Sequence, residues 1–264
     1  MKKVVLMIAA VVLTTPFFSC KEKTAEVSSN TETEAVETLP SKELALLNSS
    51  EIALDEYRYV TAPSGLSLRE YNNLQSEKVA KMPYGTKVKI ISAEGKNTMN
   101  VSGIKGAMDK VAFNHKEGFA FNGYLSKYFP PERDITVKGY ASELQKQFSE
   151  VVYTETVTGS TSNPITTETL LLPNIPWHEA FGTAQRLYDF PDEFEFPYPK
   201  GKDEEIIFDG KPKKGIWISQ LEISRKENEL QKIEYVYSSQ QFSSKVTIEK
   251  EGDTMKISRT EEVK

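Results

Sequence analysis

Short runs of alternating apolar and polar residues, separated by turn-forming residues, recur along the chain from Tyr57 onward. Examples are "TKVKIIS", "IWISQLEIS" and "QKIEYVYS", and the intervening turns include "PSG", "PYG" and "HKEG". Because successive side chains of a β-strand point to opposite faces of the sheet, this alternation indicates strands with one covered face and one wet face. The sequence therefore predicts a mainly β protein built from antiparallel sheets.

The distribution of charge divides the chain into two regions after residue 131. Basic residues outnumber acidic ones in residues 57–131, and acidic residues outnumber basic ones in residues 132–264. Pro130 and Pro131 form a stiff pair between the two regions. We therefore expect two domains, residues 51–131 and residues 132–264, and the first should be a small, strongly bent antiparallel barrel that folds alone.

Two helical segments interrupt the strand pattern of the second region. Apolar residues recur at helical spacing over residues 177–187, and Asn174 can cap this helix. A shorter helix is predicted over residues 141–148. Most of the chain that follows is predicted to form successive strands. Residues 132–264 are thus expected to be an α+β domain in which a helix packs on an antiparallel meander.

The segments "VTAPSGLSLREYNNLQSEKVAKMPYGTKVKII" and "GIKGAMDKVAFNHKEGFAFNGYLSKY" resemble a bacterial SH3 domain (SH3b) of exported and cell-wall-associated proteins. The resemblance rests on "GLSLR", on "MPYGTKVKI" and on the closing "GFAFNGYL". Phe119 stands where the family pattern has a tryptophan, and Met108 lies near where a second aromatic residue is expected. The resemblance covers residues 57–131 and implies an SH3-like barrel with a binding role in the cell envelope.

Four tyrosines of this first region lie on or next to predicted loops, and they are Tyr71, Tyr84, Tyr124 and Tyr128. Aromatic side chains with one polar end suit shallow peptide grooves, because they offer a large contact area at low entropic cost. We therefore take these four as candidate ligand-binding residues. The alternative is that two or more of them only cap the barrel.

The N-terminus has the pattern of an export signal. Lys2 and Lys3 precede an almost wholly apolar run over residues 4–18, which is short for a membrane span. Cys20 follows it and is the only cysteine in the chain, so it has no disulfide partner. The "FFSC" stretch resembles the lipobox of bacterial lipoproteins, although an ordinary signal peptide with a chance cysteine is the alternative.

The lipobox resemblance implies that residues 1–19 are removed as a signal peptide and that Cys20 becomes a lipidated first residue, with palmitate-like acyl chains that hold the protein to a membrane. Two or three acyl chains give stable attachment, whereas one gives only marginal binding. Residues 20–50 are rich in Glu, Thr and Ser and are predicted to be a flexible tether. We therefore expect an envelope protein anchored on the periplasmic face of a membrane or at the cell surface.

The sequence offers little catalytic chemistry. His115 and His178 are the only histidines and belong to different regions, and Cys20 is assigned to the anchor. His178, in the first turn of the predicted helix, is expected to be an ordinary surface residue. No phosphate loop, nucleophile elbow or nucleic-acid pattern occurs. We therefore expect a protein that is not an enzyme, with no cofactor, no metal and no nucleic-acid partner.

The leading functional hypothesis is a lipid-anchored envelope protein whose SH3b domain binds a peptide, a wall component such as peptidoglycan, or a partner protein. One alternative is an envelope hydrolase with residues 135–264 as its catalytic part. Such an enzyme would need two carboxylates flanking a sugar cleft, with Glu193 and Glu195 among the candidates. Another alternative is an inhibitor or immunity lipoprotein that sequesters a wall-degrading enzyme.

The anchor hypothesis makes a direct prediction for Cys20. Replacing Cys20→Ser removes the thiol that would carry the lipid, so the variant should lack the acyl mass and should be lost from membranes. Mass spectrometry of the N-terminal peptide and membrane fractionation measure both effects. An unmodified, soluble wild-type N-terminus would contradict the hypothesis.

Overall fold

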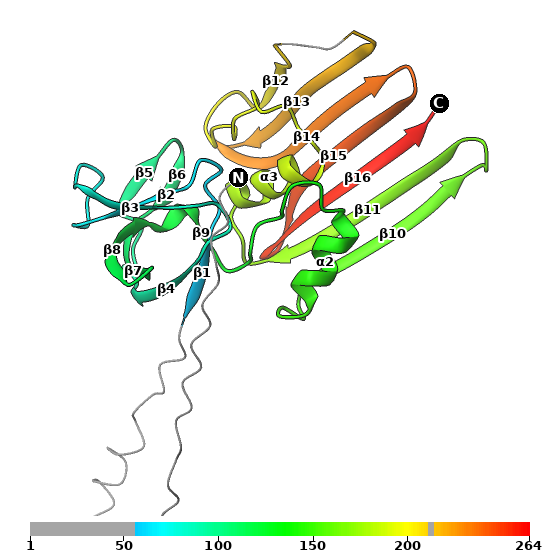
Figure 1. Ribbon diagram of the computed structural model, residues 1–264. Helices are drawn as coiled ribbons and strands as arrows, with labels where there is room; N and C mark the ends of the chain where they lie inside the picture. The colour runs from blue at the N-terminus through cyan, green and yellow to red at the C-terminus, as the bar shows by residue number, and fades with distance from the viewer. Residues whose placement is uncertain (1–55, 211–213) are drawn as a thin grey trace, which may run out of the picture. The chain divides into compact units, whose positions relative to one another are not determined.

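The computed structural model describes residues 56–210 and 214–264. The described residues belong to one compact unit. The predicted signal peptide, the lipidated Cys20 and the predicted tether lie outside the described residues. Within the described part, the protein is mainly β and its sheets are antiparallel, as the alternating pattern predicts (Figure 1).

The first region forms a seven-stranded sheet with the strand order β3-β2-β8-β7-β4-β1-β9 and a small two-stranded sheet of β5 and β6. The ladder of the large sheet ends at β3 on one side and at β9 on the other, so it does not close on itself. Its strands are β1 (Tyr57–Val60), β2 (Leu66–Arg69), β3 (Lys78–Met82), β4 (Lys87–Ser92), β7 (Met108–Phe113), β8 (Lys116–Phe121) and β9 (Leu125–Ser126). The small sheet consists of β5 (Met99–Val101) and β6 (Ile104–Gly106), and a 3-10 turn over Asn122–Tyr124 precedes β9.

The core of this first region consists of the inward-facing residues of the alternating strands. Buried apolar side chains include Val60, Leu66, Leu68, Val88, Met108 and Val111. Gly118 is required where β2 and β8 meet, because a Cβ atom there would lie 2.5 Å from the carbonyl oxygen of Arg69. The glycine before Phe119 is therefore explained by close strand contact.

The second region forms another seven-stranded sheet, with the order β10-β11-β16-β15-β14-β13-β12. The last strand, β16, pairs with β11 as well as β15, so the sheet is a five-stranded meander joined to the β10-β11 hairpin. The strands are β10 (Val152–Gly159), β11 (Pro164–Pro173), β12 (Glu204–Phe208), β13 (Ile216–Lys226), β14 (Glu229–Ser239), β15 (Phe242–Glu251) and β16 (Thr254–Val263).

Two helices, α2 (Val137–Gln145) and α3 (Trp177–Leu187), lie on one face of this second sheet (Figure 1). Their buried residues, among them Leu144, Ala180 and Phe181, pack with inward-facing sheet residues such as Leu221 and Ile257 in one core. The opposite face of the sheet carries polar side chains, for example Thr167 and Thr260, whose hydroxyls lie 3.2 Å apart across β11 and β16. One face is thus covered and the other is wet.

The start of α2 and the N-cap of α3 differ from the sequence predictions, whereas α3 spans the predicted residues. Helix α2 begins at Val137 rather than at residue 141, because the Thr136 side chain accepts a hydrogen bond from the Gly139 N–H at 3.1 Å and caps it. Asn174 does not cap α3, whose N-cap is Pro176. Asn174 instead adopts a φ of 60°, and its N–H donates to the Asp253 carbonyl at 2.7 Å.

The segment that joins the two regions is packed. Tyr128 precedes the expected boundary at residue 131, yet its side chain belongs to the core of the second region and is 2% exposed. Its ring meets that of Phe148 edge-on with centroids 4.8 Å apart, and its hydroxyl donates to the Pro173 carbonyl at 3.1 Å. Pro130 and Pro131 are buried as well. The proline pair therefore does not act as an exposed spacer.

Candidate functional site

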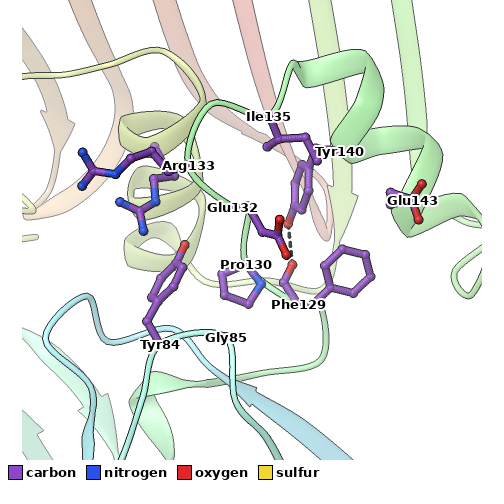
Figure 2. A pocket seen from close by; sticks show the side chains of 10 residues that line it. Tyr84, Gly85, Phe129, Pro130, Glu132, Arg133, Ile135, Tyr140 and Glu143 are labelled. Atoms are coloured by element: carbon purple, nitrogen blue, oxygen red, sulfur yellow. Dashed lines mark hydrogen bonds between the residues drawn. The ribbon is translucent and has the colours of Figure 1, made fainter. Parts of the chain in front are cut away.

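A groove with a cavity volume of about 660 Å³ lies where the two regions meet. Tyr84 and Gly85 contribute to it from the turn between β3 and β4, and Arg186 contributes from α3. Its remaining lining comes from the connecting segment around Phe129 to Ile135 and from Tyr140 and Glu143 on α2 (Figure 2). Its volume falls in the range of small-ligand pockets.

Tyr84 is held in place as one wall of this groove. Gly85 beside it has a φ of 77°, a conformation that glycine adopts without strain, and this allows the tight turn. The Tyr84 hydroxyl donates to the Pro131 carbonyl at 3.0 Å, and the Arg186 guanidinium carbon lies 4.8 Å from the ring centroid. Desolvation raises the pKa of Tyr84, while the charge and hydrogen bond of Arg186 act to lower it.

The other walls of the groove are largely apolar. Phe129, Pro130 and Ile135 line it, and Tyr140 contributes a buried ring. The Tyr140 hydroxyl donates to the Phe129 carbonyl at 2.8 Å, as Figure 2 shows. Burial raises the pKa of Tyr140 well above its ordinary value, so this hydroxyl stays neutral and keeps donating. These contacts fix the Tyr140 side chain against the connecting segment on this side of the groove.

The groove also contains charges of both signs. Arg133 and Arg186 contribute guanidinium groups, and Glu132 and Glu143 contribute carboxylates. Arg133, Glu132 and Glu143 are exposed, whereas Arg186 is half-buried. The Nε atom of Arg186 is buried and has no hydrogen-bond partner within the described part of the chain. The arrangement can hold a ligand that has an apolar portion and at least one charged group.

His178 joins the two regions at the first turn of α3. Its Nε2 lies 2.6 Å from the Gly123 carbonyl, and its ring meets the rings of Tyr124 and Phe196 edge-on. Burial lowers the pKa of His178, so the neutral ring donates its Nε2 proton to Gly123. The expectation of an ordinary surface histidine is therefore wrong, because the first turn of α3 packs against the first region.

Glu179, the next residue, makes a second contact between the regions. The Ser126 hydroxyl donates to its carboxylate, and the same hydroxyl oxygen accepts from the Tyr128 N–H at 2.9 Å. Burial raises the pKa of the Glu179 carboxyl to about 7, although the Ser126 hydrogen bond and the charge of Arg58 act to lower it. Glu179 is thus a half-buried acid whose pKa of about 7 lies close to neutral pH.

The structure does not gather the four candidate tyrosines on one surface. Tyr71 is 60% exposed and does not line the groove, and Tyr84 does line it. Tyr124 is half-buried against His178, and Tyr128 is buried in the second core. The positions of Tyr124 and Tyr128 favour packing over ligand contact, so a ligand-binding role stays a prediction for Tyr71 and Tyr84.

Sequence reasoning missed the two groove arginines. Arg133 directly follows the proline pair in "PPERD", and Arg186 lies in the last turn of α3. An arginine in the last turn of a helix is ordinarily explained by its interaction with the helix dipole. The sequence around Arg133 and Arg186 therefore contains no pattern that predicts a shared site, and only the fold brings the two side chains to the same cavity.

The acids proposed for the hydrolase alternative lie on a packed loop. Phe194 between them is buried, and Phe196 packs against both cores, while Asp192, Glu193 and Glu195 are exposed. In the part of the chain that the structure describes, no cluster of three or more His, Cys, Asp or Glu residues is placed to hold a metal. No helix among the described residues is long and apolar enough to cross a membrane.

The chain was compared with protein families, curated proteins and solved structures. No family model, curated protein or solved structure matches the chain.

The contrast between buried and exposed tyrosines predicts different effects on stability. Tyr128→Ala should lower the free energy of unfolding by about 3–5 kcal/mol, as for other buried aromatic side chains. Tyr71→Ala, the same substitution at an exposed site, should change it by less than about 0.5 kcal/mol. Urea unfolding of the two variants measures both values. Equal effects would contradict the placement of Tyr128 in the core.

The raised pKa of Glu179 predicts a dependence of stability on pH. The folded protein keeps the carboxyl protonated up to about pH 7, whereas the unfolded chain releases the proton near the ordinary pKa of 4.5. This group therefore makes the free energy of unfolding fall as pH rises between these values. His178 has the opposite effect below pH 6.5. Because its pKa is lowered in the folded protein, it makes the free energy of unfolding rise as pH rises in that range.

The Glu179→Gln variant separates the two contributions, because it removes only the acid. We expect this variant to gain stability relative to the wild type between pH 5 and pH 8, as followed by urea unfolding at each pH. Wild-type and variant curves that run parallel across this interval would show that Glu179 ionises normally in the folded protein.

Proposed function

We propose that the protein is a lipid-anchored protein of the bacterial cell envelope that binds a peptide segment, from a wall component or a partner protein, in the groove at Tyr84 and Arg186. Its first region would be an SH3-like barrel and its second an α+β domain. In this proposal the lipid on Cys20 supplies the attachment to the membrane, and the groove supplies the recognition.

The positions of the motifs in the strands support the SH3-like assignment. The "GLSLR" segment supplies β2, and "PYGTKVKI" supplies the turn that contains Tyr84 and then most of β4. The "GFAF" segment ends β8, where Gly118 allows close contact with β2. Each motif therefore has a structural task in one small sheet, which is what the resemblance requires.

The observation that carries the binding proposal is the composition of the groove. It combines an aromatic ring fixed by two contacts, an apolar wall and charged groups of both signs. Peptides present the same mixture of apolar side chains, hydrogen-bonding backbone and charges. A cavity that is largely preformed also limits the entropy lost on binding.

Binding is favoured over catalysis by the exposure of the carboxylates. The groove is lined by Glu132 and Glu143, and both are exposed. A glycosidase needs one acid in a desolvated position that keeps it protonated. Glu179 is the acid that burial affects in this way, but it does not line the groove and is hydrogen-bonded to Ser126.

The proposal predicts that Tyr84 contributes to binding of the cell wall. The full-length chain in detergent should co-sediment with isolated peptidoglycan sacculi, and Tyr84→Ala should weaken this binding by about 2 kcal/mol or more if Tyr84 is a hot spot. Tyr71→Ala is measured beside it, and the matched control is Tyr198→Ala, which should bind as the wild type does because Tyr198 is 57% exposed and does not line the groove. Thermal unfolding of each variant checks that the fold is kept.

Three outcomes would contradict the proposal or one part of it. Loss of binding in Tyr71→Ala but not in Tyr84→Ala would move the site away from the groove. A wild-type chain that does not bind sacculi would exclude the wall component. Release of muropeptides during the incubation would favour the hydrolase alternative.

A further inference from the structure

The arginines of the described residues differ in whether an acceptor within the protein binds their guanidinium groups. Arg225 pairs with Glu205 at 2.8 Å, Arg259 pairs with Glu168 at 2.8 Å, and Arg58 pairs with Glu56. Arg69 donates to the Ser76 carbonyl at 2.6 Å. The two other arginines of the described chain, at positions 133 and 186, reach no carboxylate and no carbonyl within the described residues. Both line the groove.

We propose that the groove binds the free carboxylate at the end of a short peptide, with Arg133 and Arg186 as its anchors and the Tyr84 side of the groove as the support for the terminal residue. This inference rests on the proposed function, and it names the chemical group that the groove recognises.

Arg186 is prepared for such a contact by its surroundings. Its guanidinium carbon lies 4.8 Å from the Tyr84 ring centroid, and its buried Nε has no hydrogen-bond partner within the described residues. The stack on Tyr84 limits the freedom of the side chain, and a guanidinium held in this way loses less entropy when it binds a planar carboxylate. Arg133 also lines the groove.

A carboxylate fits the charges of the groove better than a phosphate does. A planar guanidinium fork binds either group through two parallel hydrogen bonds. However, Glu132 and Glu143 also line the groove, so its formal charge is balanced and a dianion would be repelled. A peptide end carries one negative charge, and the rest of the peptide can place an amine or amide N–H near these acids.

The apolar wall accounts for the remainder of the ligand. Phe129, Pro130 and Ile135 line the groove beside the arginines. They would pack against a small aliphatic side chain at the peptide end and exclude water from the carboxylate contacts, which strengthens charge-assisted hydrogen bonds. Two sources share this chemistry: the D-alanine end of a wall stem peptide and the C-terminus of a protein chain.

The test compares a free acid with its amide on the full-length chain in detergent. Isothermal titration would use acetyl-Lys-D-Ala-D-Ala, the same peptide with a C-terminal amide, and acetyl-Lys-L-Ala-L-Ala as the free acid. Of the two free acids, we expect the tighter-binding one to bind at least about tenfold more tightly than the amide of the same peptide. The amide lacks the negative charge and therefore loses the charge-assisted hydrogen bonds. An amide of the L-peptide completes the comparison.

Arg133→Gln should remove most of the preference for the acid, and its matched control is Lys138→Gln, an exposed cation on α2 that does not line the groove. Arg186→Lys keeps the charge but loses the fork, so it should weaken acid binding and leave amide binding nearly unchanged. If Arg186→Lys fails to fold in a thermal melt, Arg133→Gln alone decides, since Arg133 is exposed.

The outcomes separate this inference from the proposed function. Tighter binding of the D-peptide acid supports a wall stem peptide, tighter binding of the L-peptide acid supports a protein C-terminus, and equal binding supports recognition of the carboxylate alone. Equal affinity for acid and amide overturns the carboxylate assignment while groove binding stands. Failure of every free acid to bind also overturns it, and sacculus binding that depends on Tyr84 would then show that the groove has another ligand.

Discussion

Two hydrogen bonds at the first turn of α3 hold the two regions together. His178 donates to the Gly123 carbonyl, and Glu179 accepts from the Ser126 hydroxyl. Because both bonds fix the start of one helix, they also fix the direction of the helix, and Arg186 about two turns later lies over Tyr84. The groove therefore depends on this contact between the regions.

The connecting segment contributes to the same arrangement from the other side. Tyr128 anchors it in the second core, and the Pro131 carbonyl accepts from Tyr84 of the first region. A segment tied to both regions cannot act as a hinge without breaking these contacts. The walls of the groove are thus held at a set distance, and such a preformed site loses little entropy when a ligand enters.

The charged groups that stabilise the fold differ from those that line the groove. Arg225 has a side chain that is almost wholly buried and is satisfied by Glu205 and by the carbonyls of Tyr198 and Lys202, so it ties a long loop to β13. Arg133 is exposed and makes no such contacts within the described residues. Substitutions at Arg133 are therefore expected to cost little in folding stability, so the proposed binding role of the groove can be tested without disturbing the fold.

The alternating pattern alone was sufficient to predict a mainly β, antiparallel protein with a helix over residues 177–187, because strand and helix periodicity depend on neighbours in the sequence. The pairing of β11 with β16 and the contact of His178 with Gly123 join residues far apart in the chain, so no local pattern predicts them. The four tyrosines have the same chemistry, yet long-range packing left Tyr71 exposed and buried Tyr128. Arg133 and Arg186 likewise share a groove only because tertiary contacts between separate segments bring them to it.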